Sequence, residues 1–388
     1  SYLGGIDGMS AGAVFSATAI SAGIATLCMA FFANYPVALA SGMGLNAFFA
    51  FTVCGAMGYS YKVALTAVFI EGIIFMLLSL FKFREALVNK IPSNLKFAIT
   101  AGIGLFIAII ALLNANVVVA SESTTVALGE LSSPTVVLSL VGLLIIGALQ
   151  HYKVPGGILL GILITWVLGI IAQLVGWYVP NPEAGVYSVI PQFSLSSFEA
   201  PKMFQFDFGF IAKNVPAFIL IVFTFLYTDI FDTVGTLIGV AEKGKLLDKD
   251  GSLPNATGAL MADAVGTVVG ACFGTSTVTS YVESSAGVAA GGRTGLTAVT
   301  TAVLFFISLI FAPIFTSIPS FATTPAMLYV GLLMLSSIRQ VKFDGDIADA
   351  IGAFLAIIMM PLTYSIANGI MFGIVSWVIL KLVTGKAK

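Results

Sequence analysis

Long apolar runs recur along the whole 388-residue chain and constrain its fold more than any other feature. A helix needs about 20 predominantly apolar residues to cross the roughly 30 Å hydrocarbon core of a bilayer. Only 9% of the residues are charged and 59% are hydrophobic, whereas soluble domains carry about 25% charged residues. The sequence therefore predicts an all-α polytopic membrane protein with 13 spans, at residues 11–33, 37–57, 62–82, 96–114, 134–150, 155–177, 215–241, 256–273, 275–290, 294–316, 323–338, 347–363 and 366–384.

Basic residues are distributed unevenly between the loops on the two sides of these spans. Loops that stay in the cytoplasm are enriched in Lys and Arg. One side carries 14 of the 17 basic residues, and the other carries only Lys62, Lys202 and Lys213. This asymmetry predicts a multi-pass protein of the cell membrane with a cytoplasmic C-terminus and Ser1 outside. Because the chain begins outside with Ser and shows no signal peptide, we expect one further span upstream and 14 in the whole protein.

The remaining composition argues against several other classes of protein. The net charge is −1, and basic residues gather only in the predicted cytoplasmic loops, so no nucleic-acid partner is expected. Cys28, Cys54 and Cys272 lie scattered within apolar spans, which fits neither a metal cluster nor a disulfide framework. The single histidine, His151, sits at the end of a span. We therefore predict no catalytic residue, no metal site and no cofactor.

An internal similarity predicts two related halves. Fourteen spans divide into seven plus seven, and a repeat with an odd number of spans must insert with inverted topology. Residues 23–42 align without gaps to residues 264–283, which pairs Thr26 with Thr267. Each segment ends in a short β-prone run, "YPVALA" and "TSTVTSYV". We expect two short strands in interrupted helices, meeting near the midplane where transporters bind their cargo.

Five acidic residues lie in the interior of the predicted spans, with no Lys or Arg beside them: Glu71, Asp229, Asp232, Asp263 and Glu283. Each costs about 2.5–3.5 kcal/mol on insertion scales, and such residues usually mark substrate or proton pathways. Uncompensated acids must be protonated, bind a cation or accept hydrogen bonds from a ligand rich in donors. The set therefore favours a proton-coupled, N–H-bearing substrate over an anion.

The segment "FTFLYTDIFDTVGTLIGVA" at 223–241 is the most informative of the spans. Asp229, Asp232 and Thr236 recur at helical spacing, which predicts one polar stripe along a cavity. Gly235 and Gly239 form a small-xxx-small pair that lets another helix come close. The alternative is that the acids only bind neighbouring helices.

The other acids are interpreted from their surroundings. Glu283 lies among hydroxyls and small residues before a predicted half-helix, and we interpret it as a cavity residue too. Glu71 and Asp263 lack polar companions, so structural hydrogen bonds and proton handling stay open for both.

The third informative stretch is "SGMGLNAFFAF" at 41–51. Gly42 and Gly44 allow close backbone approach. Asn46 offers both a donor and an acceptor, and an amide within a span needs partners. Phe48 and Phe49 offer ring faces to a ligand, although core packing is the commoner role of aromatic residues.

These stretches resemble one known family of transporters. "GMGLNAFFAFT", "TDIFDTVGTLIGVA", "FGTSTVTSYVESSAGVAAGGRTG" and "IPSNLKFAITAGIGLFIA" are similar to the AzgA-like adenine/guanine/hypoxanthine permeases of the nucleobase–cation symporter (xanthine/uracil permease) family. The resemblance covers essentially the whole chain. It implies two inverted seven-helix repeats, with a core domain at 1–90 and 181–318 and a gate domain at 91–180 and 319–388.

The resemblance also implies a substrate site between core and gate, close to the two strands. Asn46, Asp229, Asp232 and Glu283 match the family's substrate-site residues, and Phe49 matches the aromatic residue that lies against the base. Glu283 could accept hydrogen bonds from the N1–H edge of guanine or hypoxanthine, and Asn46 could bond N7 or the carbonyl. Asp229 or Asp232 would take the coupling proton, since two carboxyls one turn apart do not both ionise readily.

The function predicted on this basis is proton-coupled uptake of purine nucleobases by alternating access, with guanine, hypoxanthine and adenine as candidates and a homodimer as a further expectation. An anion carrier of the same fold is the main alternative, and it should present neutral or basic groups at helix N-termini. A channel should show a symmetric polar lining, and an enzyme should show a nucleophile and base pair.

Overall fold

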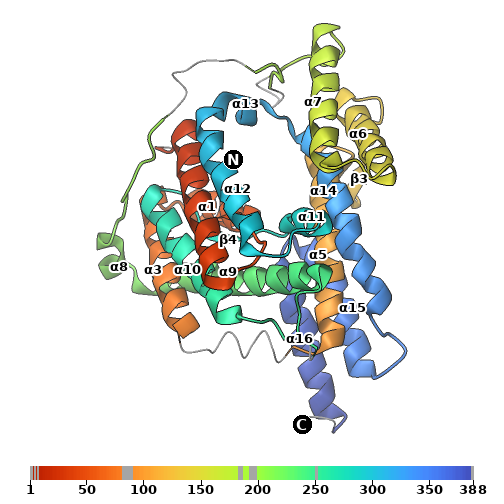
Figure 1. Cartoon of the computed structure of the whole chain (residues 1–388). Coiled ribbons are helices and arrows are strands. Elements are labelled where there is room, and N and C mark those ends of the chain that lie inside the picture. Colours follow the sequence, from red (N-terminus) through yellow and green to blue (C-terminus); the bar gives the residue numbers. More distant parts are fainter. Residues whose placement is uncertain are drawn as a thin grey trace.

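The computed structural model describes residues 3, 6, 8–80, 91–181, 187–191, 199–249 and 252–385, and helices dominate it (Figure 1). The helices are α1 (Ala11–Ala33), α2 (Met43–Ala47), α3 (Tyr61–Leu80), α5 (Ser93–Asn114), α6 (Pro134–His151), α7 (Gly157–Leu174), α8 (Gly209–Lys213), α9 (Val215–Gly244), α10 (Ala256–Phe273), α11 (Ser284–Ala289), α12 (Gly295–Ile310), α13 (Ala312–Ser317), α14 (Ser320–Leu335), α15 (Ile347–Thr363) and α16 (Ile366–Val383). A π-helix, η2 (Phe48–Ala56), continues α2, and a 3-10 helix, η5 (Ser336–Gln340), follows α14.

Nine helices in this described part are long and apolar enough to cross a membrane, so the predicted all-α polytopic fold is confirmed. Two of the predicted spans, 37–57 and 275–290, are each split into a strand and a following helix. The total of 13 spans stays a prediction.

Two short strands lie in the interrupted segments. Strand β1 (Leu39–Ser41) pairs antiparallel with β4 (Val278–Ser280), and Leu39 stands opposite Ser280. Each strand follows a long helix, α1 or α10, and leads into a short one, α2 or α11. The predicted strands in interrupted helices are therefore confirmed. A second pair of strands, the hairpin of β2 (Val118–Ser121) and β3 (Thr125–Leu128), connects α5 to α6 and was not predicted.

Threonine side chains satisfy backbone groups of these strands. The Thr26 hydroxyl of α1 accepts a hydrogen bond from the Leu39 N–H at 2.9 Å and donates to the Leu39 carbonyl at 3.2 Å. The Thr267 hydroxyl of α10 donates to the Val278 carbonyl at 2.9 Å. A strand with only one neighbour leaves backbone groups unpaired, and buried groups of this kind need partners. The two threonines that align in the sequence thus do similar work in the structure.

The helices form two groups that meet along α9 (Figure 1). In the first bundle, α1 packs against α10 and α12, and α10 packs against α3. In the second bundle, α5 packs against α14 and α15, α15 against α16, and α6 against α7 and α14. Helix α9 contacts α3 of the first bundle and α5 and α16 of the second. The division of the chain into a core and a gate domain, and their movement as separate units, stays a prediction.

Glycines bring α9 close to the second bundle. A β-carbon at Gly235 would stand 2.9 Å from the Ile370 side chain of α16, and one at Gly239 would stand 2.8 Å from Met334 of α14. A larger residue at either position would therefore force the Ile370 or Met334 side chain to shift. This is the close helix approach that the small-xxx-small spacing predicts.

Polar contacts fasten the C-terminal end of α9 to η5. The Glu242 carboxylate accepts hydrogen bonds from the Ser337 hydroxyl at 2.7 Å and the Gln340 amide at 2.9 Å. The neighbouring Lys243 ammonium donates to the Ser336 hydroxyl at 2.5 Å. The end of α9 is thus tied to the second bundle by three hydrogen bonds.

The pairing of Thr26 with Leu39 generates a stability prediction. Thr26→Val keeps the shape of the side chain but leaves the N–H and C=O of Leu39 without their hydroxyl partner. A buried unsatisfied polar group costs about 1–3 kcal/mol, so the thermal midpoint of the detergent-solubilised protein should fall. Thr300→Val is the matched control, because Thr300 is exposed and its hydroxyl bonds only Leu296 in its own helix. Equal midpoints for the two variants would contradict the role assigned to Thr26.

Candidate functional site

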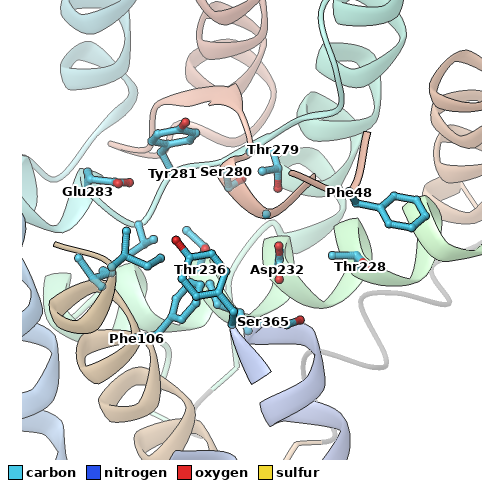
Figure 2. A pocket seen from close by; sticks show the side chains of 17 residues that line it. Phe48, Phe106, Thr228, Asp232, Thr236, Thr279, Ser280, Tyr281, Glu283 and Ser365 are labelled. Atoms are coloured by element: carbon cyan, nitrogen blue, oxygen red, sulfur yellow. The ribbon is translucent and has the colours of Figure 1, made fainter. Parts of the chain in front are cut away.

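A cavity of about 210 Å³ lies where the strand pair, α9, α5 and the turn between α15 and α16 meet (Figure 2). Pockets for drug-sized ligands span about 300–1,000 Å³, so this cavity suits a smaller molecule. It is lined by Gly42, Gly44, Phe48, Phe106, Ile107, Ile110, Thr228, Asp232, Thr236, Thr279, Ser280, Tyr281, Val282, Glu283, Tyr364, Ser365 and Ile366. Both bundles therefore contribute to its wall.

Two carboxyls share this cavity. Asp232 reaches it from the middle of α9, and Glu283 reaches it from the residue that precedes α11. Figure 2 shows Glu283 beside Tyr281 and Asp232 between Thr228 and Thr236, on separate parts of the wall. No Lys, Arg or His occurs among the described residues that line the cavity. A ligand that brings protons or N–H donors would complement such a site.

The Asp232 carboxyl stands at the boundary between the bundles. The backbone N–H of Ala367, in the first turn of α16, faces it. The N-terminal end of a helix carries a partial positive charge that favours a carboxylate. The Oδ1 atom of Asp232 is buried and has no hydrogen-bond partner among the described residues. The carboxyl is therefore held from one side and keeps an acceptor for a further donor.

Helix α9 carries two polar faces instead of the one predicted stripe. Thr228, Asp232 and Thr236 follow one another at spacings of four residues and line the cavity. Asp229 and Thr233 are fully buried and point elsewhere, with the Thr233 hydroxyl 3.4 Å from the Asp229 carboxyl. Three residues along a helix turn by about 300° and four by about 400°, so the spacing alone did not separate these two faces.

The second face joins a buried network that holds β4. The Thr233 hydroxyl lies 2.8 Å from both the Asp263 carboxyl and the Thr279 hydroxyl. The Asp263 carboxyl also accepts hydrogen bonds from the backbone N–H of Ser280 at 2.8 Å and from its hydroxyl at 2.9 Å. Of the two roles left open for Asp263, the structure shows the structural one. Glu71 is fully buried in α3 and does not line the cavity.

Asn46 lies in the short helix α2, which follows β1, and is not among the residues that line the cavity. Its side-chain carbonyl accepts a hydrogen bond from the Ser41 hydroxyl at 2.7 Å, and its amide donates to the Ser41 carbonyl at 3.4 Å. The Tyr281 hydroxyl donates to the same carbonyl at 2.7 Å. Asn46 and Tyr281 thus hold the turn from β1 into α2 from two sides.

The two neighbouring phenylalanines have different environments. Phe48 is half-buried and lines the cavity, whereas Phe49 is fully buried, with its ring centroid 6.4 Å from that of Phe225. The resemblance implied Phe49 as the aromatic residue against the ligand, whereas of the two it is Phe48 that lines the cavity. Both residues stand where α2 passes into the π-helix η2, and consecutive helical residues point in directions about 100° apart. The sequence pattern alone could not resolve this choice.

Sequence reasoning missed three aromatic residues of the cavity wall: Phe106, Tyr281 and Tyr364. Tyr281 stands two residues before Glu283, and that proximity was the only available signal. Phe106 belongs to an apolar span and Tyr364 to the short connection between two predicted spans, and neither stands near an acidic residue in the sequence. Their place in the site results from how the two bundles meet.

Comparison with known proteins identifies the family. The model of the Permease family, which describes xanthine/uracil permeases, matches residues 2–372. The chain belongs to the xanthine/uracil permease family. A putative permease of Methanocaldococcus jannaschii is 46% identical over 381 residues, which cover 98% of this chain and 84% of that protein. The resemblance of the sequence motifs to this family is thus confirmed.

Two further relatives have named cargoes. Guanine/hypoxanthine permease PbuO of Bacillus subtilis is 45% identical over 382 residues, covering 96% of this permease and 84% of that protein. Adenine permease AdeQ of Escherichia coli is 41% identical over 373 residues, covering 96% and 81%. The permease is therefore a multi-pass membrane transporter and not an enzyme.

Solved structures support the fold. The transmembrane domain of the cyanobacterial bicarbonate transporter BicA superposes with a TM-score of 0.60 at 14% identity, covering 98% of this permease and 92% of that chain. At such identity the likeness concerns the fold alone.

The different surroundings of Asp263, whose carboxyl is hydrogen-bonded, and Asp232, whose Oδ1 has no partner among the described residues, generate a stability prediction. Asp263→Asn places an amide donor among the donors of Ser280 and Thr233, so the thermal midpoint without ligand should fall by an amount equivalent to about 1–3 kcal/mol. Asp232→Asn should leave the midpoint unchanged or raise it, because a buried carboxyl with an unsatisfied oxygen is costly in the empty protein. Both variants can be compared by thermal unfolding in detergent. An Asp232→Asn midpoint as low as that of Asp263→Asn would show that both acids are structural.

Proposed function

We propose that this permease carries purine nucleobases together with protons across the cell membrane by alternating access, with its C-terminus in the cytoplasm. The observation that carries the proposal is that Asp232 and Glu283 share one cavity whose described lining holds no basic side chain. The purine permeases among its relatives supply the class of cargo. The uneven distribution of basic loop residues supports the orientation.

The cavity offers groups that complement a purine. Guanine and hypoxanthine present an N1–H, which the Glu283 carboxylate can accept as a charge-assisted hydrogen bond. The hydroxyls of Thr228 and Thr236 line the same space and can donate to ring nitrogens or to a carbonyl. Buried polar groups of this kind reject ligands that leave them unpaired. Recognition would thus depend on the donor pattern of the base.

The other predicted site residues support this cavity from behind its wall. Asn46 fixes the turn after β1 through its bonds to Ser41. Asp229 contacts the network of Thr233, which bonds the cavity residue Thr279. Phe49 packs beside Phe225, whose ring centroid lies 4.9 Å from that of the cavity residue Phe48. We propose that these three act on the substrate through the residues they hold.

Asp232 is the proposed carrier of the coupling proton. It lies in the cavity, whereas Asp229 is enclosed by the protein. Its carboxyl faces the second bundle through the Ala367 N–H, so a change in its charge alters the contact between α9 and α16. Protonation would neutralise Asp232, allow the base to bind and let the first bundle move against the second. An ion coupled in this way shifts an equilibrium only through its different affinity for the two states.

The anion carrier is the competing function with the same fold. A pair of acids without a basic neighbour repels an anion, and desolvation strengthens that repulsion. The likeness to the bicarbonate transporter extends to the fold alone and does not decide the cargo. The two carboxyls therefore favour a nucleobase over an anion as the cargo.

Transport by purified permease in liposomes tests the proposal. An inward proton gradient should drive accumulation of radiolabelled hypoxanthine or guanine by the wild type. Glu283→Ala should weaken purine binding by about tenfold or more, as expected for loss of a hydrogen bond to a charged group worth about 1.5–3 kcal/mol. Asp232→Asn should abolish accumulation driven by the gradient and retain exchange of labelled for unlabelled base.

The exposed residues Glu122 and Asp344 provide matched controls. Glu122→Ala and Asp344→Asn make the same chemical changes outside the cavity and should transport normally. Normal purine uptake by Glu283→Ala, or normal proton-driven accumulation by Asp232→Asn, would refute the corresponding assignment.

A further inference from the structure

The turn between α15 and α16 places an aromatic side chain in the cavity. Only Tyr364 and Ser365 connect the two helices, and both residues line the cavity together with Ile366. The next residue, Ala367, directs its backbone N–H at Asp232. The tip of this helical hairpin is therefore part of the site and faces α9.

The backbone of Tyr364 adopts a conformation that side chains disfavour. Its φ is 54° and its ψ is 35°, in the left-handed region, where it ends α15. Glycine is the usual residue at such a helix end because it has no β-carbon. A strained position of this kind persists where the surrounding structure holds it, and such positions cluster at functional sites. The strained backbone therefore indicates that the side chain of Tyr364 has a function that glycine could not supply.

The ring of Tyr364 is held but not enclosed. Phe106 of α5, itself only 9% exposed, meets it edge to face, with centroids 5.7 Å apart and planes at 75°. Tyr364 remains 40% exposed and lines the cavity. Figure 2 shows Phe106 across the cavity from Tyr281, which follows β4 of the strand pair. The second bundle therefore supplies an aromatic wall, and the strand segments and α9 supply the carboxyls.

We propose that Tyr364 is the contact of the second bundle with the bound nucleobase and covers the flat face of the base with its ring. This inference rests on the proposed function and adds a residue to its site. Every base has a π face, so stacking on an aromatic side chain does not depend on the hydrogen-bonding pattern of the base. Phe106 is a positioning residue, since its ring meets the Tyr364 ring edge to face and orients it.

The proposed contact of Tyr364 would connect the two bundles through the bound base and would favour larger bases. A base held by Glu283 and covered by Tyr364 connects the two bundles, and this contact forms only while the hairpin tip stands against α9. Because stacking grows with the area of overlap, the two-ring purines gain more from Tyr364 than a one-ring pyrimidine does. Tyr364 should therefore set the preference for purine over pyrimidine.

Three substitutions of Tyr364 distinguish the contributions of its ring, its hydroxyl and its backbone conformation to binding and stability. Tyr364→Phe keeps the ring and should bind hypoxanthine within about twofold of the wild type. Tyr364→Gly should raise the thermal midpoint of the empty protein, because glycine accepts the left-handed conformation, and should weaken hypoxanthine binding by about tenfold. Tyr364→Asn tolerates the same backbone and should show the same loss without the added flexibility of glycine.

Binding is measured with labelled hypoxanthine in detergent, and uracil as competitor reports the purine preference, which Tyr364→Gly and Tyr364→Asn should reduce. Lys153→Gly is the control, since Lys153 is also left-handed, with a φ of 53°, and is exposed in the loop between α6 and α7. Lys153→Gly should raise the thermal midpoint, because it relieves backbone strain, and should leave hypoxanthine binding unchanged.

Wild-type affinity in Tyr364→Gly would overturn the assignment. A loss in Tyr364→Phe equal to that in Tyr364→Gly would also overturn it, because the hydroxyl and not the ring would then carry the contact. If the wild type binds purine and Glu283→Ala does not, either result disproves only the role of Tyr364. If the wild type binds no purine at all, the proposed function itself fails.

Discussion

The pairing of β1 with β4 is the interaction on which the rest of the structure depends. Extended backbone inside a helical membrane protein must find all its hydrogen bonds within the protein. The two strands satisfy each other, and hydroxyls of α1 and α10 satisfy further backbone groups. Asp263 fixes β4 through the Ser280 N–H. Because Glu283 and Tyr281 follow β4 directly, and Phe48 follows β1, this small sheet sets where the ligand-facing groups stand.

Helix α9 links the sheet to the second bundle. One of its faces bonds the Asp263 network, and the neighbouring face presents Asp232 to the cavity. Its C-terminal end is tied to η5 through Glu242. Any displacement of α9 against the second bundle must break the Glu242 bonds and separate Asp232 from the Ala367 N–H. In the proposed mechanism, substrate, proton and bundle contact therefore act on the same helix, which is the physical requirement for coupling them.

The fold and the chemistry of the site carry different information. A bicarbonate transporter shares the architecture at 14% identity, so the arrangement of helices by itself permits more than one cargo. The two acids, and the absence of any basic side chain among the described cavity residues, narrow the choice. The aromatic side chains around them favour a flat ligand. In the proposed function, selectivity thus depends on a few side chains of the cavity and not on the fold.

The sequence by itself determined the membrane class, the family and the segments that hold the two strands, because apolar length, motif and the repeat of Thr26 and Thr267 are local signals. It also indicated Asp232 and Glu283, since acids in apolar spans are costly wherever they lie. Only the tertiary structure decided that Phe48 rather than Phe49 faces the cavity, that Asp229 points away from it, and that Tyr364 joins it. Those outcomes depend on how the helical segment after β1 is oriented, on the rotation of α9 about its axis and on where the α15–α16 turn meets α9. Packing between distant segments sets all three, and no single stretch of sequence encodes it.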